Sequence, residues 1–295
     1  MSFQPVFDNF ATRPKTATLK NPSATFHALI RDQFSILTWL LLGASIQALA
    51  SAFLPYRNIV LVLPILLILS YKFTTTLLTL SGILSNPRME SVIPKRTSIV
   101  LPDEKRIPNS IGGSTVCAII LGVVSNHPLG MFGPGFKGVG DRFDAMIEEL
   151  SRDATKHGFL GTSAWLGASE RTTSNEYMSI VYFENEGYLH AFAHGPLHSE
   201  ALRWWRATEK EHGHLGIMHE VFSCPKKSWE GIYINYQPTG LGTTAKEVTS
   251  ETGQKSWVNP LVRVSGNKLL YSKGRMGRSV GEKEWDEMKP SEVAA

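Results

Sequence analysis

The chain has 295 residues, of which 42% are hydrophobic and 19% are charged, and its formal net charge at pH 7 is +4. This length allows one or two domains with additional segments, and no Lys/Arg-rich run interleaved with aromatics is present, which argues against nucleic acid as a partner. Two cysteines, Cys117 and Cys224, are too few for a disulfide framework in a chain of this length. They favour a reducing compartment and lack the spacing of a zinc site.

Two apolar stretches dominate the first third of the chain. Residues 1–30 are polar and contain several prolines, which predicts a loosely ordered tail. Within residues 31–85, positions 33–54 carry no charge and positions 58–84 carry only Lys72. This length and composition predict a membrane-anchoring transmembrane helical hairpin. A single crossing followed by an interfacial or re-entrant helix remains the alternative, because of Lys72 and the short connector between the stretches.

The basic residues around the hairpin predict its orientation. Arg31 precedes the first apolar stretch, and Arg88, Lys95 and Arg96 follow the second, whereas Arg57 is the only basic residue in the turn. Cytoplasmic flanks are enriched in Lys and Arg, so both outer ends are expected on the cytosolic side. We therefore expect a protein of the endoplasmic reticulum membrane, with its soluble domain facing the cytosol.

The soluble part is predicted as a linker at 86–112, a catalytic domain at 113–240 and a partly flexible C-terminal extension at 241–295. The expected elements of the domain are, in order, a strand at 114–124, a glycine-rich loop at 127–140, an amphipathic helix at 141–156, strands at 159–168 and 177–183, helices at 184–194 and 197–211, and strands at 214–222 and 231–237.

This order predicts an α+β, ferredoxin-like βαββαβ domain. The helices of such a domain cover only one face of its antiparallel sheet. We expect a second subunit to cover the other face, which gives a homodimer built as a dimeric α+β barrel. The cavity for a small ligand would then lie between each sheet and its own helices.

Histidines are concentrated in residues 175–222, which hold six of the nine in the chain. His198 and Trp205 share one face of the second predicted helix, where a histidine beside a tryptophan can act as a base. His219 in the last strand is the alternative base, and Asn126 after the first strand is the candidate donor to an oxyanion. Taken alone, each of these residues is more often structural than functional.

Four residues are predicted to contact the substrate: Trp205, Trp165, His194 and Tyr182. The two tryptophans would wall an apolar pocket. His190, His194 and His198 have a spacing that suits a metal, but Pro196 breaks the helix between them and no HExxH motif is present.

The segment VYFENEGYLHAFAHGPLHSEALRWW resembles the strand-to-helix signature of antibiotic-biosynthesis-type monooxygenases, which are dimeric α+β barrels. The longer block from LGVVSNHPLGMFGPGF through MHEVFSCPKKSWEGIYINYQPTGLG resembles a fungal family typified by a membrane-associated monooxygenase of the fumagillin pathway. The resemblance implies oxygenation of a small lipophilic secondary metabolite, with dioxygen as co-substrate and neither metal nor flavin. In haem-degrading relatives a helix histidine binds iron, and His198 is the nearest match, whereas Tyr182–Phe183 replaces their strand-end tryptophan.

Three functional hypotheses follow. The first is a membrane-anchored, cofactor-independent oxygenase with a pocket histidine as base. The second is a haem or metal enzyme of the same fold, with His198 or His194 as ligand. The third is a non-catalytic, membrane-anchored protein that binds a metabolite or assists another enzyme. An absorption spectrum separates the second from the other two.

Overall fold

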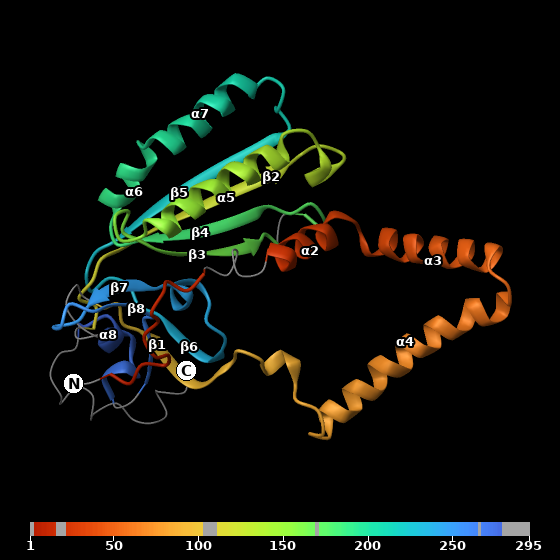
Figure 1. Cartoon of the computed structure of the whole chain (residues 1–295), viewed down its shortest axis with the longest axis horizontal. Helices are drawn as coiled ribbons and strands as arrows, with labels where there is room; N and C mark the ends of the chain where they lie inside the picture. Colours follow the sequence, from red (N-terminus) through yellow and green to blue (C-terminus); the bar gives the residue numbers. More distant parts are fainter. Residues whose placement is uncertain (1–2, 16–21, 103–110, 169–170, 265–266, 279–295) are drawn as a thin grey trace.

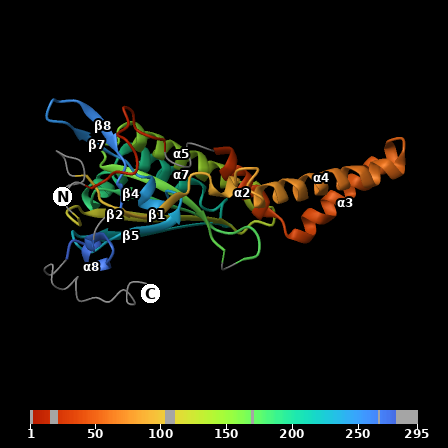
Figure 2. The same ribbon diagram turned by 90° about the horizontal axis from the view of Figure 1, so that it is seen from below.

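The structure, a computed structural model, describes residues 3–15, 22–102, 111–168, 171–264 and 267–278. Its soluble part is built on a four-stranded and a three-stranded sheet. A pair of apolar helices projects from one end of the molecule, and the β7–β8 ribbon lies at the other end (Figures 1 and 2).

The helices of the described ranges are α2 (Pro22–Gln33), α3 (Ile36–Phe53), α4 (Arg57–Leu80), α5 (Phe136–Arg152), α6 (Glu186–Ala193), α7 (Pro196–Thr208) and α8 (Ser272–Arg275), with short 3₁₀ turns η1 (Pro87–Met89), η2 (Gly130–Phe132), η3 (Gly240–Thr243) and η4 (Asn267–Leu269). The strands are β1 (Ile93–Ile99), β2 (Val116–Ser125), β3 (Phe159–Leu166), β4 (Tyr177–Phe183), β5 (Leu215–Cys224), β6 (Ile232–Tyr236), β7 (Lys246–Thr249), β8 (Lys255–Val258) and β9 (Leu261–Arg263).

The main sheet has the strand order β3-β4-β2-β5, and every neighbouring pair is antiparallel. Helices α5, α6 and α7 lie on one of its faces (Figure 1). Between them is a core of buried strand and helix residues: Cys117, Ile147, Leu150, Ala154, Phe159, Val181, Phe183, Leu189 and Phe192. The core forms because alternate strand residues and one helical stripe are apolar. The predicted α+β class is confirmed.

Helix α5 begins at Phe136 rather than at the predicted Asp141. Phe136, Val139 and Phe143 have helical spacing, but the glycines between them favoured a loop in the sequence. One of these glycines has a packing role, because a Cβ added at Gly138 would lie 3.0 Å from the ring of Trp204. The absence of a side chain therefore lets α7 approach α5.

The predicted linker contains β1, which is the central strand of the sheet β6-β1-β9. Thr97, Ser98 and Ile99 are almost fully buried. The proline-rich sequence around β1 led to the linker interpretation. An irregularity in the pairing with β6 at Ile93–Arg96 accommodates Pro94, which lacks a donor for the ladder.

The described part of the N-terminal tail is also paired rather than loosely ordered. Pro5 bridges Val262 of β9, and Phe10 bridges Trp257 of β8. The N-terminal residues therefore join strands that are some 250 positions away in the sequence, a contact that no local pattern could indicate.

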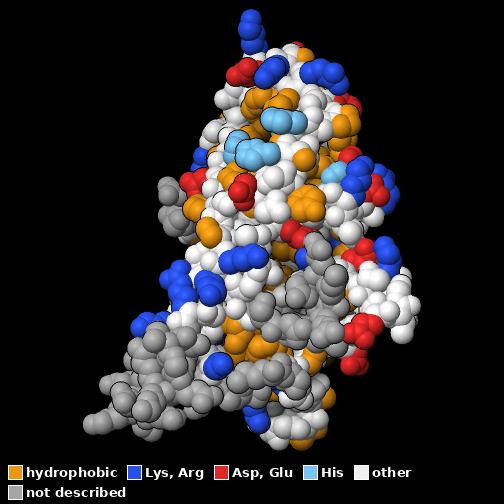
Figure 3. Space-filling view, turned by 90° about the vertical axis from the view of Figure 1, so that its left-hand side faces the viewer, with side chains coloured by type: hydrophobic (Ala, Val, Ile, Leu, Met, Phe, Trp, Pro, Cys, Tyr) orange, Lys and Arg blue, Asp and Glu red, His pale blue; other side chains and the backbone are white. Residues whose placement is uncertain are grey.

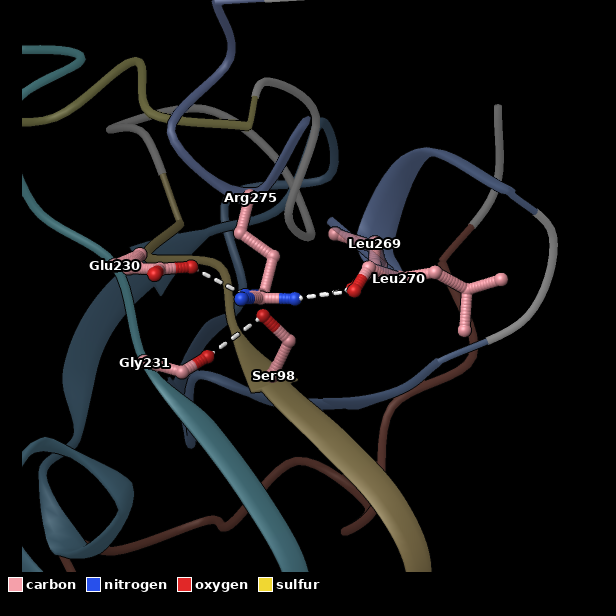
Figure 4. Close-up of polar contacts among 6 residues, drawn as sticks. All are labelled: Ser98, Glu230, Gly231, Leu269, Leu270 and Arg275. Atoms are coloured by element: carbon pink, nitrogen blue, oxygen red, sulfur yellow. Dashed lines mark hydrogen bonds and ion pairs between the residues drawn. The ribbon is translucent and has the colours of Figure 1, made fainter. Parts of the chain in front are cut away.

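The C-terminal extension is fastened by a buried arginine. The Arg275 guanidinium makes an ion pair with Glu230 and donates hydrogen bonds to the carbonyl oxygens of Leu269 and Leu270, at 3.1 and 2.7 Å (Figure 4). Nearby, the Ser98 hydroxyl donates to the Gly231 carbonyl oxygen at 2.9 Å. These contacts hold α8 against the three-stranded sheet. The described residues end at Arg278, so the last part of the extension predicted to be partly flexible lies outside them.

Helices α3 and α4 are long and apolar enough to cross a membrane. They have 18 and 24 residues and mean hydropathies of 1.7 and 1.9, and their side chains are almost entirely unburied in the chain. They pack on each other near the turn between them and diverge toward the soluble part (Figures 1 and 2). The two apolar helices predicted from the sequence are therefore present.

Candidate active site

A cavity of about 760 Å³ lies between α2, α5 and the main sheet. Its walls come from the N-terminal residues 13–15, α2, α5, β2 and β4. The large apolar lining residues are Phe26 and Leu29 of α2, Phe136 and Phe143 of α5, and Val123 of β2, and Pro14 adds to them. Its volume suits a small ligand, and such pockets combine apolar walls with a few polar groups.

The polar groups of the cavity include a carboxyl and a phenol. Asp144 is an exposed residue of α5, but partial loss of water around its carboxyl raises the pKa of that group, and the nearby carboxylates of Asp141 and Glu148 raise it further. Burial also raises the pKa of the Tyr177 hydroxyl. Asp144 is therefore a stronger base than an aspartate in water, and Tyr177 keeps its proton at neutral pH and can donate it in a hydrogen bond.

Arg13 supplies a positive charge to the same cavity. Its guanidinium lies over the rings of Phe159 and Trp257, at 4.7 and 5.4 Å from their centroids, and donates to the Leu160 carbonyl oxygen at 3.0 Å. Burial lowers its pKa to about 10, so it stays protonated at neutral pH. Its Nε is buried without a hydrogen-bond partner among the described residues.

Asp144, Tyr177 and Arg13 thus bring a carboxyl, a phenol and a guanidinium to the lining of one cavity. Lys15, Glu148 and Arg152 line the cavity as well, so its apolar walls are accompanied by charges of both signs. A carboxylate with a raised pKa is the type of group that accepts a proton, and a phenol and a guanidinium are types of group that stabilise an oxyanion.

None of the seven residues predicted from the sequence lines this cavity. His198 lies on α7, and its Nδ1 is buried without a partner among the described residues. His219 lies on β5 opposite Leu121, which places it on the helix side of the sheet. Its neighbours on that side, Ile217 and Val221, are 48% and 42% exposed, so α7 leaves β5 largely uncovered.

Histidines thus remain close to an open apolar surface. Histidine and hydrophobic side chains share the upper part of the face shown in Figure 3, at the level of α6 and α7. His194 is exposed at the end of α6, with its ring 6.5 Å from that of His190. Across the described ranges, no three His, Cys, Asp or Glu side chains are placed to hold a metal ion together.

The structure places Trp165 and Trp205 on opposite faces of the main sheet. Trp165 pairs with Met178, and it lines a smaller cavity of about 350 Å³ with β6, on the face away from the helices. Tyr182 also belongs to that face, where it packs with Ala118 and Ile180. The two tryptophans therefore do not wall one pocket within a single chain.

Asn126 is engaged in a loop contact. Its side-chain oxygen accepts a hydrogen bond from the Arg171 guanidinium, and its backbone N–H donates to the His214 carbonyl oxygen at 2.7 Å. Asn126 follows β2 as predicted, but its side chain is exposed at the end of the sheet near the apolar helices.

Sequence reasoning missed Arg13, Asp144 and Tyr177. A signal existed for Asp144, because it lies one turn after Asp141 on an amphipathic helix and directly follows Phe143. Arg13 had no such signal, since its partners lie almost 150 residues or more away in the sequence.

The main sheet and its helices define the class of the fold, an antiparallel α+β domain, which here has a cavity of small-molecule size beside it. The particular family follows from sequence comparison. Residues 116–241 match the family model described as Monooxygenase af470-like. The chain is 32% identical over 252 residues to Monooxygenase af470 of Aspergillus fumigatus (strain ATCC MYA-4609 / CBS 101355 / FGSC A1100 / Af293), across 84% of this chain and 89% of that protein. The chain belongs to this family, which confirms the resemblance seen in its sequence.

Among solved structures, the chain is similar to the aldoxime dehydratase OxdRE in complex with butyraldoxime, with 11% identity and a TM-score of 0.37 over 50% of this chain and 39% of that one. It is also similar to SnoaB, a cofactor-independent oxygenase from Streptomyces nogalater, with 16% identity and a TM-score of 0.24 over 36% of this chain and 90% of that one.

Proposed function

We propose that the chain is a membrane-anchored monooxygenase that acts on a small lipophilic metabolite held in the cavity between α2, α5 and the sheet. One observation carries this proposal. The largely apolar cavity has α2 as a wall, and α2 leads within three residues into the apolar helix α3. The similarity of the chain to Monooxygenase af470 supports the reaction class.

The hairpin gives the proposal a physical rationale. Helices α3 and α4 cross the membrane of the endoplasmic reticulum, with both outer ends on the cytosolic side, as the basic flanks favour. Lipophilic substrates partition into membranes. An enzyme held at the bilayer therefore meets them at a high local concentration.

The reaction needs neither metal nor flavin when the substrate carries an acidic C–H group. Asp144 takes the proton, and the resulting carbanion transfers electrons to dioxygen and forms a C–O bond. The hydroperoxide then loses water and leaves a carbonyl group, so one oxygen atom enters the product and the other leaves as water. Tyr177 and Arg13 stabilise the oxyanion that precedes dioxygen attack. His198 is the alternative base, supported by its buried, unpartnered Nδ1.

The assembly is part of the same proposal. The order β3-β4-β2-β5, with one helix between β2 and β3 and two between β4 and β5, supports a ferredoxin-like unit. On the sheet face away from the helices, the β6-β1-β9 sheet of the same chain covers Val116, Leu160 and Tyr182, whereas Met218 and Phe222 of the edge strand β5 are 36% and 48% exposed. This uncovered apolar strip supports a homodimer in which the two main sheets contact each other at β5.

The test uses the full-length protein in lipid nanodiscs, with anthrone as a lipophilic probe that has an acidic methylene group. We expect oxygen uptake and the conversion of that methylene to a carbonyl containing one atom of isotopically labelled dioxygen. Binding of anthrone without oxygen uptake would favour the non-catalytic binding protein. A strong absorption band at about 400 nm in the purified protein would favour the haem enzyme.

A further inference from the structure

The root of the hairpin is fixed to the soluble domain by a set of polar contacts. Asp32, near the end of α2, accepts hydrogen bonds from the backbone N–H and the side-chain amide of Asn175, at 2.8 and 2.9 Å. The side chain of Gln33 accepts from the Met131 N–H at 3.0 Å and donates to the Ser174 hydroxyl at 2.8 Å. Helix α2 is therefore bound to two loops of the soluble domain and is not a free tether.

A glycine in one of these loops permits the contact. Gly130 has φ +54°, a left-handed conformation that favours glycine, and a Cβ added there would lie 1.8 Å from the Gln33 amide nitrogen. The loop around η2 thus has to lie directly against the end of α2.

The junction between α2 and α3 is fixed as well. The Trp39 indole N–H donates to the Arg31 carbonyl oxygen at 3.0 Å, and the rings of Phe34 and Trp39 pack edge to face at 5.3 Å. The direction in which α3 leaves the soluble domain is therefore set by specific contacts (Figure 1).

Large apolar side chains are exposed at this same end of the molecule. Leu129 and Phe132, which flank Met131, are 60% and 53% exposed, and Phe26 on α2 is 53% exposed. Exposed apolar groups of this size mark contact surfaces when they are clustered. Arg31 and Arg171 are exposed on the α2 and loop segments that meet here, and such cations suit an anionic lipid surface.

We propose that Phe26, Leu129 and Phe132 form a second membrane-contact surface, which rests the soluble domain on the bilayer beside the hairpin. The inference depends on the proposed membrane insertion of α3 and α4. The partner of this surface is the bilayer that holds the hairpin. Gln33 joins the loop of Leu129 and Phe132 to α2, and α2 runs into the apolar hairpin, so the surface continues the hairpin.

The contact has a consequence for the cavity. Phe26 belongs both to the proposed surface and to the wall of the 760 Å³ cavity. Docking therefore places the α2 wall at the lipid interface, and a lipophilic substrate reaches the cavity from the bilayer between α2 and α5.

The test measures the depth of a fluorescent label in vesicles. The full-length protein carries Cys224→Ser, and Cys117 stays unlabelled because it is fully buried and its thiol pKa is raised by burial to about 11. Leu129→Cys then receives a nitrobenzoxadiazole label, and Thr252→Cys, in the β7–β8 turn at the far end of the molecule, serves as the matched control (Figure 1). The vesicles contain phosphatidylcholine, phosphatidylserine and a lipid spin-labelled near the headgroup.

We expect at least roughly two-fold stronger quenching at position 129 than at position 252. Phe132→Asp in the labelled protein should remove most of this difference, whereas Phe132→Leu should preserve it. Equal quenching at the two positions, in protein that floats with the vesicles, overturns the inference and leaves the hairpin anchor intact. Protein that does not float with vesicles contradicts the proposed anchor itself, so the two failures are distinguishable.

Discussion

The side-chain amide of Gln47 on α3 donates a hydrogen bond to the backbone carbonyl oxygen of Val60 on α4, at 2.6 Å. The Val60 carbonyl lies four residues before Pro64, which has no N–H to complete the helical bond. Gln47 therefore satisfies a carbonyl that α4 leaves open. In a lipid environment, an unsatisfied carbonyl is costly.

Gln47→Leu should consequently weaken the α3–α4 pair, by about 1 kcal/mol. Unfolding in mixed micelles with increasing SDS, followed by circular dichroism, measures the loss. Pro64→Ala provides the control, because an alanine N–H restores the helical bond to Val60. In the Pro64→Ala background, Gln47→Leu should lower the stability of the α3–α4 pair by clearly less. An equal loss of stability in both backgrounds would show that the Gln47 amide acts on something other than the Val60 carbonyl.

Asp144→Asn should raise the melting temperature at neutral pH by no more than about 1 °C, because Asp144 is exposed and water screens its interactions. The folded state raises the pKa of this carboxyl, so the unfolded chain loses the proton more readily. The ionised carboxylate therefore destabilises the fold at pH values above its raised pKa. This effect fades as the pH falls through that pKa and is absent below the unfolded value.

The difference in melting temperature between Asp144→Asn and the wild type should accordingly disappear on acidification toward a pH of about 4. Calorimetry at several pH values checks this trend. Glu200→Gln also removes an exposed carboxylate, on α7, and is the matched control that should leave the melting temperature nearly unchanged. A pH-independent gain for Asp144→Asn would indicate a packing effect instead of a charge effect.

The base is identified by comparing two variants in the anthrone assay. If Asp144 removes the proton, Asp144→Asn should lower kcat/KM by about 100-fold or more, and His198→Ala should change it by less than about threefold. The wild-type activity should fall as the pH is lowered through the raised pKa of Asp144, because the protonated carboxyl cannot accept a proton. The opposite ranking of the two variants would support His198, provided that both melt like the wild type.

Arg275→Met should destabilise the C-terminal extension, because it leaves Glu230 and two carbonyl groups without their partner (Figure 4). Arg275 is 8% exposed and Glu230 is 27% exposed, so the pair is partly shielded from water. We expect a loss of about 2–3 kcal/mol and faster cleavage near α8 in limited proteolysis. Glu230→Gln keeps a hydrogen-bond acceptor and should therefore lower the stability by less. A loss equal to that of Arg275→Met would contradict the role of the Arg275 contacts in holding the extension.

The sequence predicted the elements of the main sheet because their apolar periodicity is local. It did not predict the side of the sheet on which Trp165 lies, and the reason is an irregularity in β3. Phe159 pairs with Phe183, but Gly161 pairs with Tyr182, so one extra residue is inserted. Such a bulge moves the following side chains to the opposite face, which separates Trp165 from the helix side.

The cavity could not be predicted from local sequence patterns, for a similar reason. Its walls come from α2, α5 and the sheet, which are distant in sequence, and Arg13 reaches it only because the N-terminal residues pair with β8 and β9. The histidines of α6 and α7 were conspicuous because they are close together in the sequence. Proximity along the chain did not bring their rings into the cavity.

The position of β1 leads to a prediction about the extent of the folding unit. A chain that begins at residue 110 lacks the central strand of the sheet β6-β1-β9, as well as the α2 wall of the cavity. The loss of β1 would expose its buried neighbours Leu261 and Val262 and would leave the backbone of β6 without its hydrogen-bonded partner strand. We expect this chain to aggregate or to melt at least about 10 °C below the full-length protein.

The matched control keeps residues 1–35 and 81–295 and replaces α3 and α4 with a flexible glycine–serine linker. It retains β1, α2 and all the contacts of Asp32 and Gln33, so we expect it to remain folded and to bind anthrone in detergent-free buffer. Circular dichroism, thermal melting and analytical ultracentrifugation compare the two chains. A cooperative, monodisperse chain beginning at residue 110 would show that the three-stranded sheet is dispensable, and that the folding unit coincides with the 113–240 domain predicted from the sequence.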